Sequence, residues 1–224
     1  MRVAVMQPYF MPYAGYFRLF AAADVFVAFD CVQFPRRGWV HRNRLADHGG
    51  ELQWLTLPLA KSDRDTTRIC DLQFRSDAQK EWLAETRRFP SLDALSRRQG
   101  PLAEAVFELG NSPCDYIIRG LAHVATALGV ERRIVRSSEL GVDPGLRAQE
   151  RIIDIVRRMG GDKYVNAPGG RDLYDRQAFD AAGIRLEFLA DYMGGYGSVL
   201  ERLVLESPAE IARELSENLE LQPG

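Results

Sequence analysis

The sequence has few of the residues that would place it at once in a metal-binding or disulfide-rich class. Three cysteines and three histidines occur in 224 residues. The cysteines (Cys31, Cys70 and Cys114) are widely spaced and form no CxxC pair. The sequence therefore predicts neither a disulfide framework nor a structural zinc site, and no metal ligands are assigned. The small number of cysteines also favours a location in the reducing cytoplasm.

Strong net charge and long apolar runs are absent as well. The formal net charge is -2, so no overall basic field is available to bind nucleic acid. No stretch approaches the length of uninterrupted apolar sequence that a transmembrane helix needs, and the N-terminal region does not read as a signal peptide. We therefore expect a cytoplasmic protein without a membrane span and without a nucleic-acid partner.

Short apolar or β-branched segments alternate with helical periodicity at both ends of the chain, and this alternation favours a parallel sheet flanked by helices. Helical apolar spacing is clearest over 115–128 and 148–159, and Ser207 with Glu210 predicts a capping box for a last helix. The final four residues read as a frayed end. The expected strands lie at 3–6, 25–29, 52–57, 132–136, 163–166 and 185–189.

The middle of the chain differs from both ends. Residues 36–75 are β-rich and punctuated by turns, which predicts a hairpin, and residues 76–112 read as helical cover. We therefore expect a single α/β domain over 1–224, of the Rossmann or nucleotidylyltransferase kind. In it, residues 36–112 form an inserted hairpin with a helical subregion.

Polar side chains follow four of the expected parallel strands. Gln7 follows the first strand, Asp30 and Cys31 follow the second, Ser137 and Ser138 follow the strand near 134, and Asn166 follows the one near 165. Ligands of open α/β sheets bind beyond the carboxyl ends of the strands, so these side chains predict a polar cleft. The alternative is that loops are polar in any case.

Two loops add candidate ligand-binding groups. In "NAPGGRDLY", Gly169 and Gly170 allow close backbone approach to a phosphate or carboxylate, although a plain turn would use the same residues. In "PRRGWVHRNRL", arginine forks and a tryptophan face suit a small anionic ligand. If this segment is a strand, Trp39, His41 and Asn43 share one face, and Arg42 and Arg44 share the other. A solvated edge strand is the alternative.

Several segments, taken together and in order, resemble the WbqC-like family. They are "MRVAVMQPYFMPYAGYFRLF", "ADVFVAFDCVQF", "RRGWVHRNRL", "LTLPL", "RSSEL", "YVNAPGGRDLYDRQAFDAAGIRLEFL" and "SPAEI". This resemblance implies a role in surface polysaccharide biosynthesis, notably O-antigen, or in natural-product biosynthesis. It further implies a transferase, with amide-forming acyl or aminoacyl transfer as the leading reaction. Cys31, His41 and the stretch after Tyr192 depart from the family pattern.

A second resemblance concerns the nucleotidylyltransferases that carry an H-x-G-H motif on the first helix and an S-S-T-like run after a late strand. Tyr13, Gly15 and Tyr16 stand at the comparable place, followed later by Ser137 and Ser138. Tyrosines replace both histidines, which removes the cationic donors that phosphoryl chemistry would use. A related fold is expected, with different chemistry.

We therefore predict acyl transfer from a thioester, carried by coenzyme A or a carrier protein, onto an amine of a nucleotide-sugar or another small metabolite. No tightly bound cofactor is expected. A nucleotidyltransferase and a non-catalytic glycan- or carrier-binding module, whose aromatic platform would include Phe10 and Phe17, are the alternatives. The catalytic candidates are Asp30 or His41 as base, Gln7 as oxyanion donor, and Cys31 as a conceivable nucleophile with His41. The candidate substrate-binding residues are Tyr9, Tyr13, Tyr16, Gln33, Trp39, Arg42, Asn43, Ser137, Ser138, Asn166, Gly169, Gly170, Asp172 and Tyr174.

Overall fold

The computed structural model describes residues 1–63 and 65–224, and in this part of the chain six strands form one mostly parallel sheet. The predicted fold class is confirmed. The strand order is β5-β2-β1-β6-β7-β8, with β8 antiparallel to β7 and the other neighbours parallel. The strands are β1 (Arg2–Met6), β2 (Val25–Ala28), β5 (Arg133–Arg136), β6 (Lys163–Asn166), β7 (Arg185–Leu189) and β8 (Leu221–Pro223).

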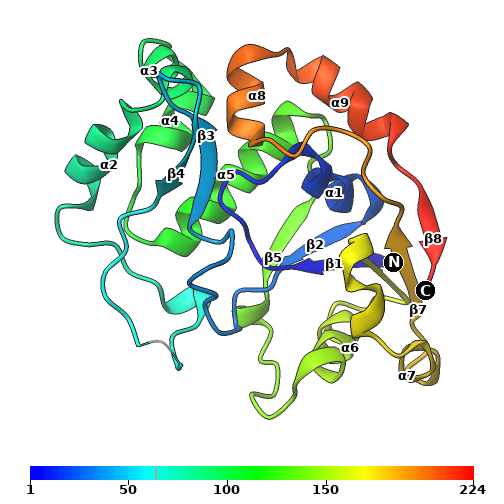
Figure 1. The fold of residues 1–224 in the computed structure, drawn as a ribbon. Coiled ribbons are helices and arrows are strands. Elements are labelled where there is room, and N and C mark those ends of the chain that lie inside the picture. Colours follow the sequence, from blue (N-terminus) through cyan, green and yellow to red (C-terminus); the bar gives the residue numbers. More distant parts are fainter. Residues whose placement is uncertain (64) are drawn as a thin grey trace.

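Helices cover both faces of this sheet (Figure 1). On one face, Val3, Val5, Val25 and Val27 pack against α6 (Ala148–Arg158) and α7 (Arg176–Ala181). The opposite face packs against the remaining flanking helices. These are α1 (Arg18–Ala22), α5 (Pro113–Ala127), α8 (Val199–Leu205) and α9 (Pro208–Glu217). Alternation of side chains along β1 and β2 supplies both faces of the core from the same strands.

Between β2 and α5 the chain forms a separate two-stranded antiparallel sheet and the helices α2, α3 and α4, which stand together to one side of the main sheet (Figure 1). The hairpin and the helical cover lie where the sequence predicts them. The elements are β3 (Arg42–Ala46), β4 (Leu52–Thr56), α2 (Ala78–Thr86), α3 (Pro90–Ser96) and α4 (Pro101–Phe107). No helix in the described part of the chain is both long and apolar enough to cross a membrane.

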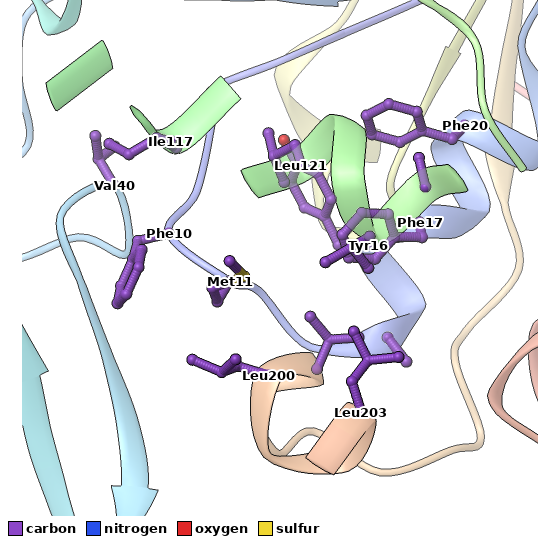
Figure 2. Close-up of a cluster of buried hydrophobic side chains, with 14 of the residues drawn as sticks. Phe10, Met11, Tyr16, Phe17, Phe20, Val40, Ile117, Leu121, Leu200 and Leu203 are labelled. Carbon is purple, nitrogen blue, oxygen red and sulfur yellow. The ribbon is translucent and has the colours of Figure 1, made fainter. Parts of the chain in front are cut away.

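Two phenylalanines of the aromatic stretch after β1 belong to the core rather than to the surface. Figure 2 shows Phe10 and Phe17 in a buried cluster with Val40, which precedes β3, and with side chains from α5 and α8. Phe10 is 1% exposed and Phe17 is 0% exposed, so the predicted sugar-stacking platform is wrong for these two rings. The same segment leads into α1 through a short turn. A 3-10 turn, Ala14–Phe17, precedes α1.

The C-terminal end corrects a second prediction. Its last residues are not frayed, because β8 pairs with β7 along Leu189↔Leu221 and Glu187↔Pro223. A proline is tolerated here because β8 is an edge strand. The predicted capping box of α9 is confirmed, since Ser207 Oγ accepts from the Glu210 backbone while the Glu210 carboxylate accepts from the Ser207 backbone.

Candidate functional site

A cleft of about 480 Å³ opens at the carboxyl ends of β1 and β6. From β1 the chain passes to β2 and β5 on one side of the sheet, whereas β6 and β7 lie on the other side. Numbered along the chain, the sheet strands therefore read 3-2-1-4-5-6, the order of dinucleotide-binding α/β folds. In that order the crevice between the first and fourth strands is the place where ligands bind, and the cleft lies there.

The cleft brings together many of the residues that the sequence singled out. It is lined by predicted site residues from the β1 end, from the turn before α1 and from the loop after β6. These are Gln7, Tyr9, Tyr13, Tyr16, Asn166, Gly169, Gly170 and Tyr174.

The β1 end of the cleft is fixed by a buried tyrosine. Tyr16 is 4% exposed, and its hydroxyl donates to the Gln7 carbonyl over 2.8 Å. The Tyr9 ring packs against the Tyr16 ring, with centroids 5.6 Å apart. These contacts hold the Gln7 backbone, while the Gln7 side-chain amide makes no hydrogen bond with a described residue. It is therefore available to a ligand.

The β6 end contains a small hydrogen-bonded chain. The Asn166 amide donates to the Tyr174 hydroxyl over 3.3 Å, and that hydroxyl lies 3.1 Å from the hydroxyl of Tyr164. A Cβ atom at Gly170 would come within 2.5 Å of Asn166 Nδ2, so glycine is needed there. A Cβ at Gly169 would meet nothing within 4 Å.

Each polar side chain that lines the cleft can donate a hydrogen bond. Burial raises the pKa of Tyr9, Tyr13 and Tyr174, so their hydroxyls stay protonated at neutral pH. The lining of the cleft by described residues includes no carboxylate, imidazole or thiol. It includes one cation, Arg18, which the sequence reasoning missed. The available signal was an arginine inside the otherwise apolar run "GYFRLF".

A second group of predicted residues gathers at the carboxyl ends of β2 and β5. We call Asp30, Arg136, Ser137 and Ser138 the Asp30 cluster. The Asp30 side chain is 0% exposed and accepts from Ser137 Oγ at 3.0 Å, from Ser138 N and Oγ at 2.8 Å each, and from Arg136 Nε at 2.8 Å. A buried carboxylate with four N–H and O–H donors is suited to anchoring strand ends, and Asp30 is not among the residues that line the cleft.

The cysteines lie around the Asp30 cluster rather than in the cleft. The Cys31 backbone N–H donates to Ser137 Oγ over 3.2 Å. Cys114 Sγ lies 3.7 Å from Asp30 Oδ2, and burial raises its pKa to about 12. Burial also raises the pKa of Cys70 to about 11. Cys70 and Cys114 therefore remain thiols near neutral pH and lack the thiolate character of a nucleophile.

His41 lines a different hollow, together with Arg36, Lys61 and Arg75. Burial and the charge of Arg42 lower its pKa to about 4. Its Nδ1 is buried without a hydrogen-bond partner among the described residues. His41 is therefore not among the residues that line the cleft, and it makes no hydrogen bond with Cys31.

The remaining candidates on the hairpin also lie outside the cleft lining. Arg42 and Arg44 share a face and stand over the Trp54 ring at 4.0 and 4.6 Å, and the Trp39 ring lies 5.3 Å from it. The face-sharing expected if this segment were a strand does not extend to Trp39, because the strand begins only at Arg42 and Trp39 lies on the arginine side. The Asn43 amide is buried and donates to the Phe10 carbonyl over 3.1 Å.

Gln33 and Asp172 also lie outside the cleft lining. Gln33 forms an isolated bridge with Arg68, away from the cleft lining, and Asp172 is exposed. Within residues 1–63 and 65–224, no three His, Cys, Asp or Glu side chains gather in a way that could hold a metal ion.

The comparisons with known proteins agree with the sequence resemblance. A model of the WbqC-like protein family matches residues 7–197, which span both ends of the cleft. The chain is also 27% identical over 196 residues to "Uncharacterized protein Rv1507c" of Mycobacterium tuberculosis (strain ATCC 25618 / H37Rv). That match covers 86% of this chain and 83% of the relative. No solved structure gives a significant match.

Proposed function

The chain belongs to the WbqC-like protein family, and we propose that it is a group-transfer enzyme that binds a small anionic substrate in the β1–β6 cleft. The reaction we propose is amide formation, in which an acyl or aminoacyl group passes from a thioester to an amine of a nucleotide-sugar or related metabolite. The setting is surface polysaccharide or natural-product biosynthesis. The thioester is carried by coenzyme A or by a carrier protein.

The observation that carries this proposal is a cleft lining that offers hydrogen-bond donors and one cation but, among the described residues, no anionic side chain. The amide of Gln7 and the hydroxyls of Tyr9 and Tyr13 face it without a hydrogen bond to a described residue, and no carboxylate stands among them. Such donors stabilise negative charge that develops on a carbonyl oxygen during acyl transfer. A carboxylate in their place would oppose that charge.

The reaction balances without a basic side chain in the cleft. A neutral amine nitrogen attacks the thioester carbon, the carbon–sulfur bond breaks, and the departing thiolate takes the proton that the nitrogen loses. In this proposal Asp30 and His41 move no proton, which agrees with their positions outside the cleft lining. The contribution of the chain is orientation and oxyanion stabilisation.

Nucleotidyl transfer is the second candidate, and the strand order favours it. The cleft lies where nucleotide phosphates bind in sheets of that order. Against it, the lining offers no carboxylate for a magnesium ion, because Asp30 is enclosed and Asp172 is exposed outside the lining residues. Any divalent ion would have to arrive with the nucleotide.

The test is a turnover assay with defined probes. Purified protein is incubated with acetyl-coenzyme A and UDP-glucosamine while free thiol is titrated and products are weighed by mass spectrometry. We expect thiol release that requires both substrates, with one equivalent of N-acetylated product per thiol. The Gln7→Leu variant should lose roughly 10²–10³ in turnover, the cost of one oxyanion donor. The matched control Gln73→Leu, at an exposed position, should retain wild-type turnover.

Other results would overturn the proposal. Pyrophosphate release from a nucleoside triphosphate and a sugar phosphate, without thiol release, would replace it with nucleotidyl transfer. Binding of UDP-glucosamine without any product from a panel of acyl-thioesters would favour the binding-module alternative.

A further inference from the structure

Arg18 is the buried cation of the cleft. It is the first residue of α1, it is 1% exposed, and it lies among the lining residues. Arginine is seldom buried to this degree unless its charge is paired. Its surroundings therefore show whether the protein itself supplies the opposite charge.

The hydrogen bonds of Arg18 go to neutral backbone oxygens. Nε donates to the Gly15 carbonyl at 3.3 Å, and Nη1 donates to the carbonyls of Ala190 and Asn218 at 2.9 Å each. Nη2 donates to no described residue. Within residues 1–63 and 65–224, no carboxylate lies within ion-pair distance of this guanidinium.

Three other partly buried arginines of the chain form ion pairs with carboxylates. Arg2 pairs with Glu187 at 2.6 Å. Arg136 pairs with Asp30 at 2.8 Å, and Arg202 pairs with two glutamates at 2.6 and 2.8 Å. Each of these three is more exposed than Arg18, yet each has a carboxylate partner. The least exposed of these four cations is therefore the one whose charge the described chain leaves uncompensated.

Arg18 stands over one ring of a tyrosine cluster. Its Cζ lies 4.9 Å from the centroid of the Tyr192 ring, and the Tyr13 ring lies 5.5 Å from Tyr192 and 5.0 Å from Tyr196. The ring faces offset part of the charge. The acidic group that acts on Arg18 electrostatically is Asp191, which is exposed and makes no ion pair with it.

We propose that Arg18 and the Tyr13 hydroxyl form an anion subsite at the α1 end of the cleft, which binds a phosphate or carboxylate oxygen of the substrate through Nη2. This deepens the proposed function and rests on the cleft being the substrate site. A cleft of about 480 Å³ is large enough for a ligand that reaches from Arg18 to the loop after β6. The anionic group of the substrate would lie at the first end, and the Gly169–Gly170 turn would face the other end of the molecule.

Calorimetric titration of the intact protein tests the subsite without turnover. The probes are UDP as a phosphate ligand, glucuronate as a carboxylate ligand, and uridine as the neutral control. We expect UDP or glucuronate to bind, and whichever binds identifies the oxyanion. Arg18→Met should weaken that binding about 10- to 100-fold, the value of a charge-assisted hydrogen bond, and Arg18→Lys should lose less. Arg213→Met, which removes an exposed arginine, should bind as the wild type does.

Tyr13→Phe keeps the ring packing and removes the hydroxyl, so it tests the subsite even if Arg18→Met does not fold. We expect a roughly fivefold to tenfold loss of UDP affinity, as for one hydrogen bond. If Arg18 only ties α1 to the C-terminal segment, both Arg18 variants that fold should lose stability while probe affinity stays unchanged, and the subsite is then refuted. Failure of every anionic probe to bind the wild type also refutes it.

The two proposals fail separately. If UDP binds through Arg18 and no acyl or nucleotidyl transfer is detected, the proposed function fails and the subsite stands. If turnover is observed while Arg18→Met binds UDP as the wild type does, the function stands and the subsite fails.

Discussion

The cleft and the Asp30 cluster both consist of polar side chains at strand ends. They differ in whether those side chains already have hydrogen-bond partners within the described part of the protein. Both lie at carboxyl ends of parallel strands of one sheet, the cleft at β1 and β6 and the cluster at β2 and β5. In the cluster, four N–H and O–H donors form hydrogen bonds with one buried carboxylate. In the cleft, Gln7, Tyr13 and Arg18 keep donor groups that no described residue uses.

The difference shows that residue type at a strand end does not by itself identify a binding site. A satisfied buried network stabilises the fold, because each group has lost water and gained a partner. Groups that line an open cleft without partners keep their hydrogen-bonding capacity for a ligand. We therefore expect mutations in the cluster to change the free energy of unfolding and mutations in the cleft to change ligand affinity.

The largest expected effect is on stability, from Asp30→Ala. Removal of the carboxylate leaves Arg136 Nε and two serine hydroxyls without their acceptor. We expect the free energy of unfolding, measured by urea denaturation, to fall by about 3–5 kcal/mol. Asp172→Ala, which removes an exposed carboxylate, should change it by less than about 0.5 kcal/mol. Equal losses of unfolding free energy in Asp30→Ala and Asp172→Ala would contradict a stabilising role for the Asp30 cluster.

His41 extends the comparison, because its side chain is half-buried and its buried Nδ1 lacks the hydrogen-bond partners that Asp30 has among the described residues. Its folded pKa of about 4 lies below the ordinary value of 6.5, so the unfolded chain binds the extra proton first as pH falls. The contribution of neutral His41 to the free energy of unfolding is therefore fully present above about pH 6.5. It declines by up to about 3 kcal/mol as pH falls to about 4. Urea denaturation at several pH values should show this decline reduced in His41→Leu. It should persist in His48→Gln, which changes an exposed imidazole. Identical pH profiles for all three proteins would contradict it.

Within the cleft, two adjacent glycines give a matched pair. In Gly170→Ala the new Cβ would stand 2.5 Å from Asn166 Nδ2, whereas in Gly169→Ala it would meet nothing within 4 Å. We expect Gly170→Ala to lower the free energy of unfolding by about 1–3 kcal/mol and to weaken UDP binding, because the Asn166 amide must turn away. Gly169→Ala should resemble the wild type in both measurements. A larger effect at Gly169 would show that the packing around Asn166 does not shape the cleft.

The smallest expected effect concerns pH and the cleft donors. Burial raises the pKa of Tyr13 despite the opposing charge of Arg18, so its hydroxyl remains a donor in mildly alkaline solution. Affinity for UDP, whose phosphates are fully ionised above about pH 8, should stay within roughly twofold up to about pH 9. If Tyr13 ionised in this range, its negative charge would repel the nucleotide. A tenfold fall in calorimetric affinity over the same interval would therefore contradict the account.

Much of the fold could be predicted from the sequence because its signals are local. The strand at 3–6 is a short apolar run followed by Gln7, the strand at 163–166 has Tyr164 and Val165 before Asn166, and the structure has strands at both places. The capping box at Ser207 depends on residues three apart. The last strand was missed because Leu221–Pro223 forms a strand only by pairing with β7, about thirty residues earlier in the chain.

The state of the candidate site could be predicted only in part, since it depends on contacts between distant residues. The positions of Gln7 and Asn166 follow from strand ends alone, and both line the cleft. The saturation of Asp30 does not follow, because its donors lie 106 to 108 residues away. Arg18 was missed because sequence patterns treat an arginine as solvent-exposed, whereas here the chain buries it against backbone carbonyls.

The most direct test of the account is a crystal structure of the wild-type protein soaked with UDP. The account predicts density for the nucleotide in the β1–β6 cleft, with a phosphate oxygen within hydrogen-bond distance of Arg18 Nη2 and the rest of the ligand lying toward Gln7. Density against His41, or over the Trp39–Trp54 face of the hairpin, with the cleft left empty would contradict it.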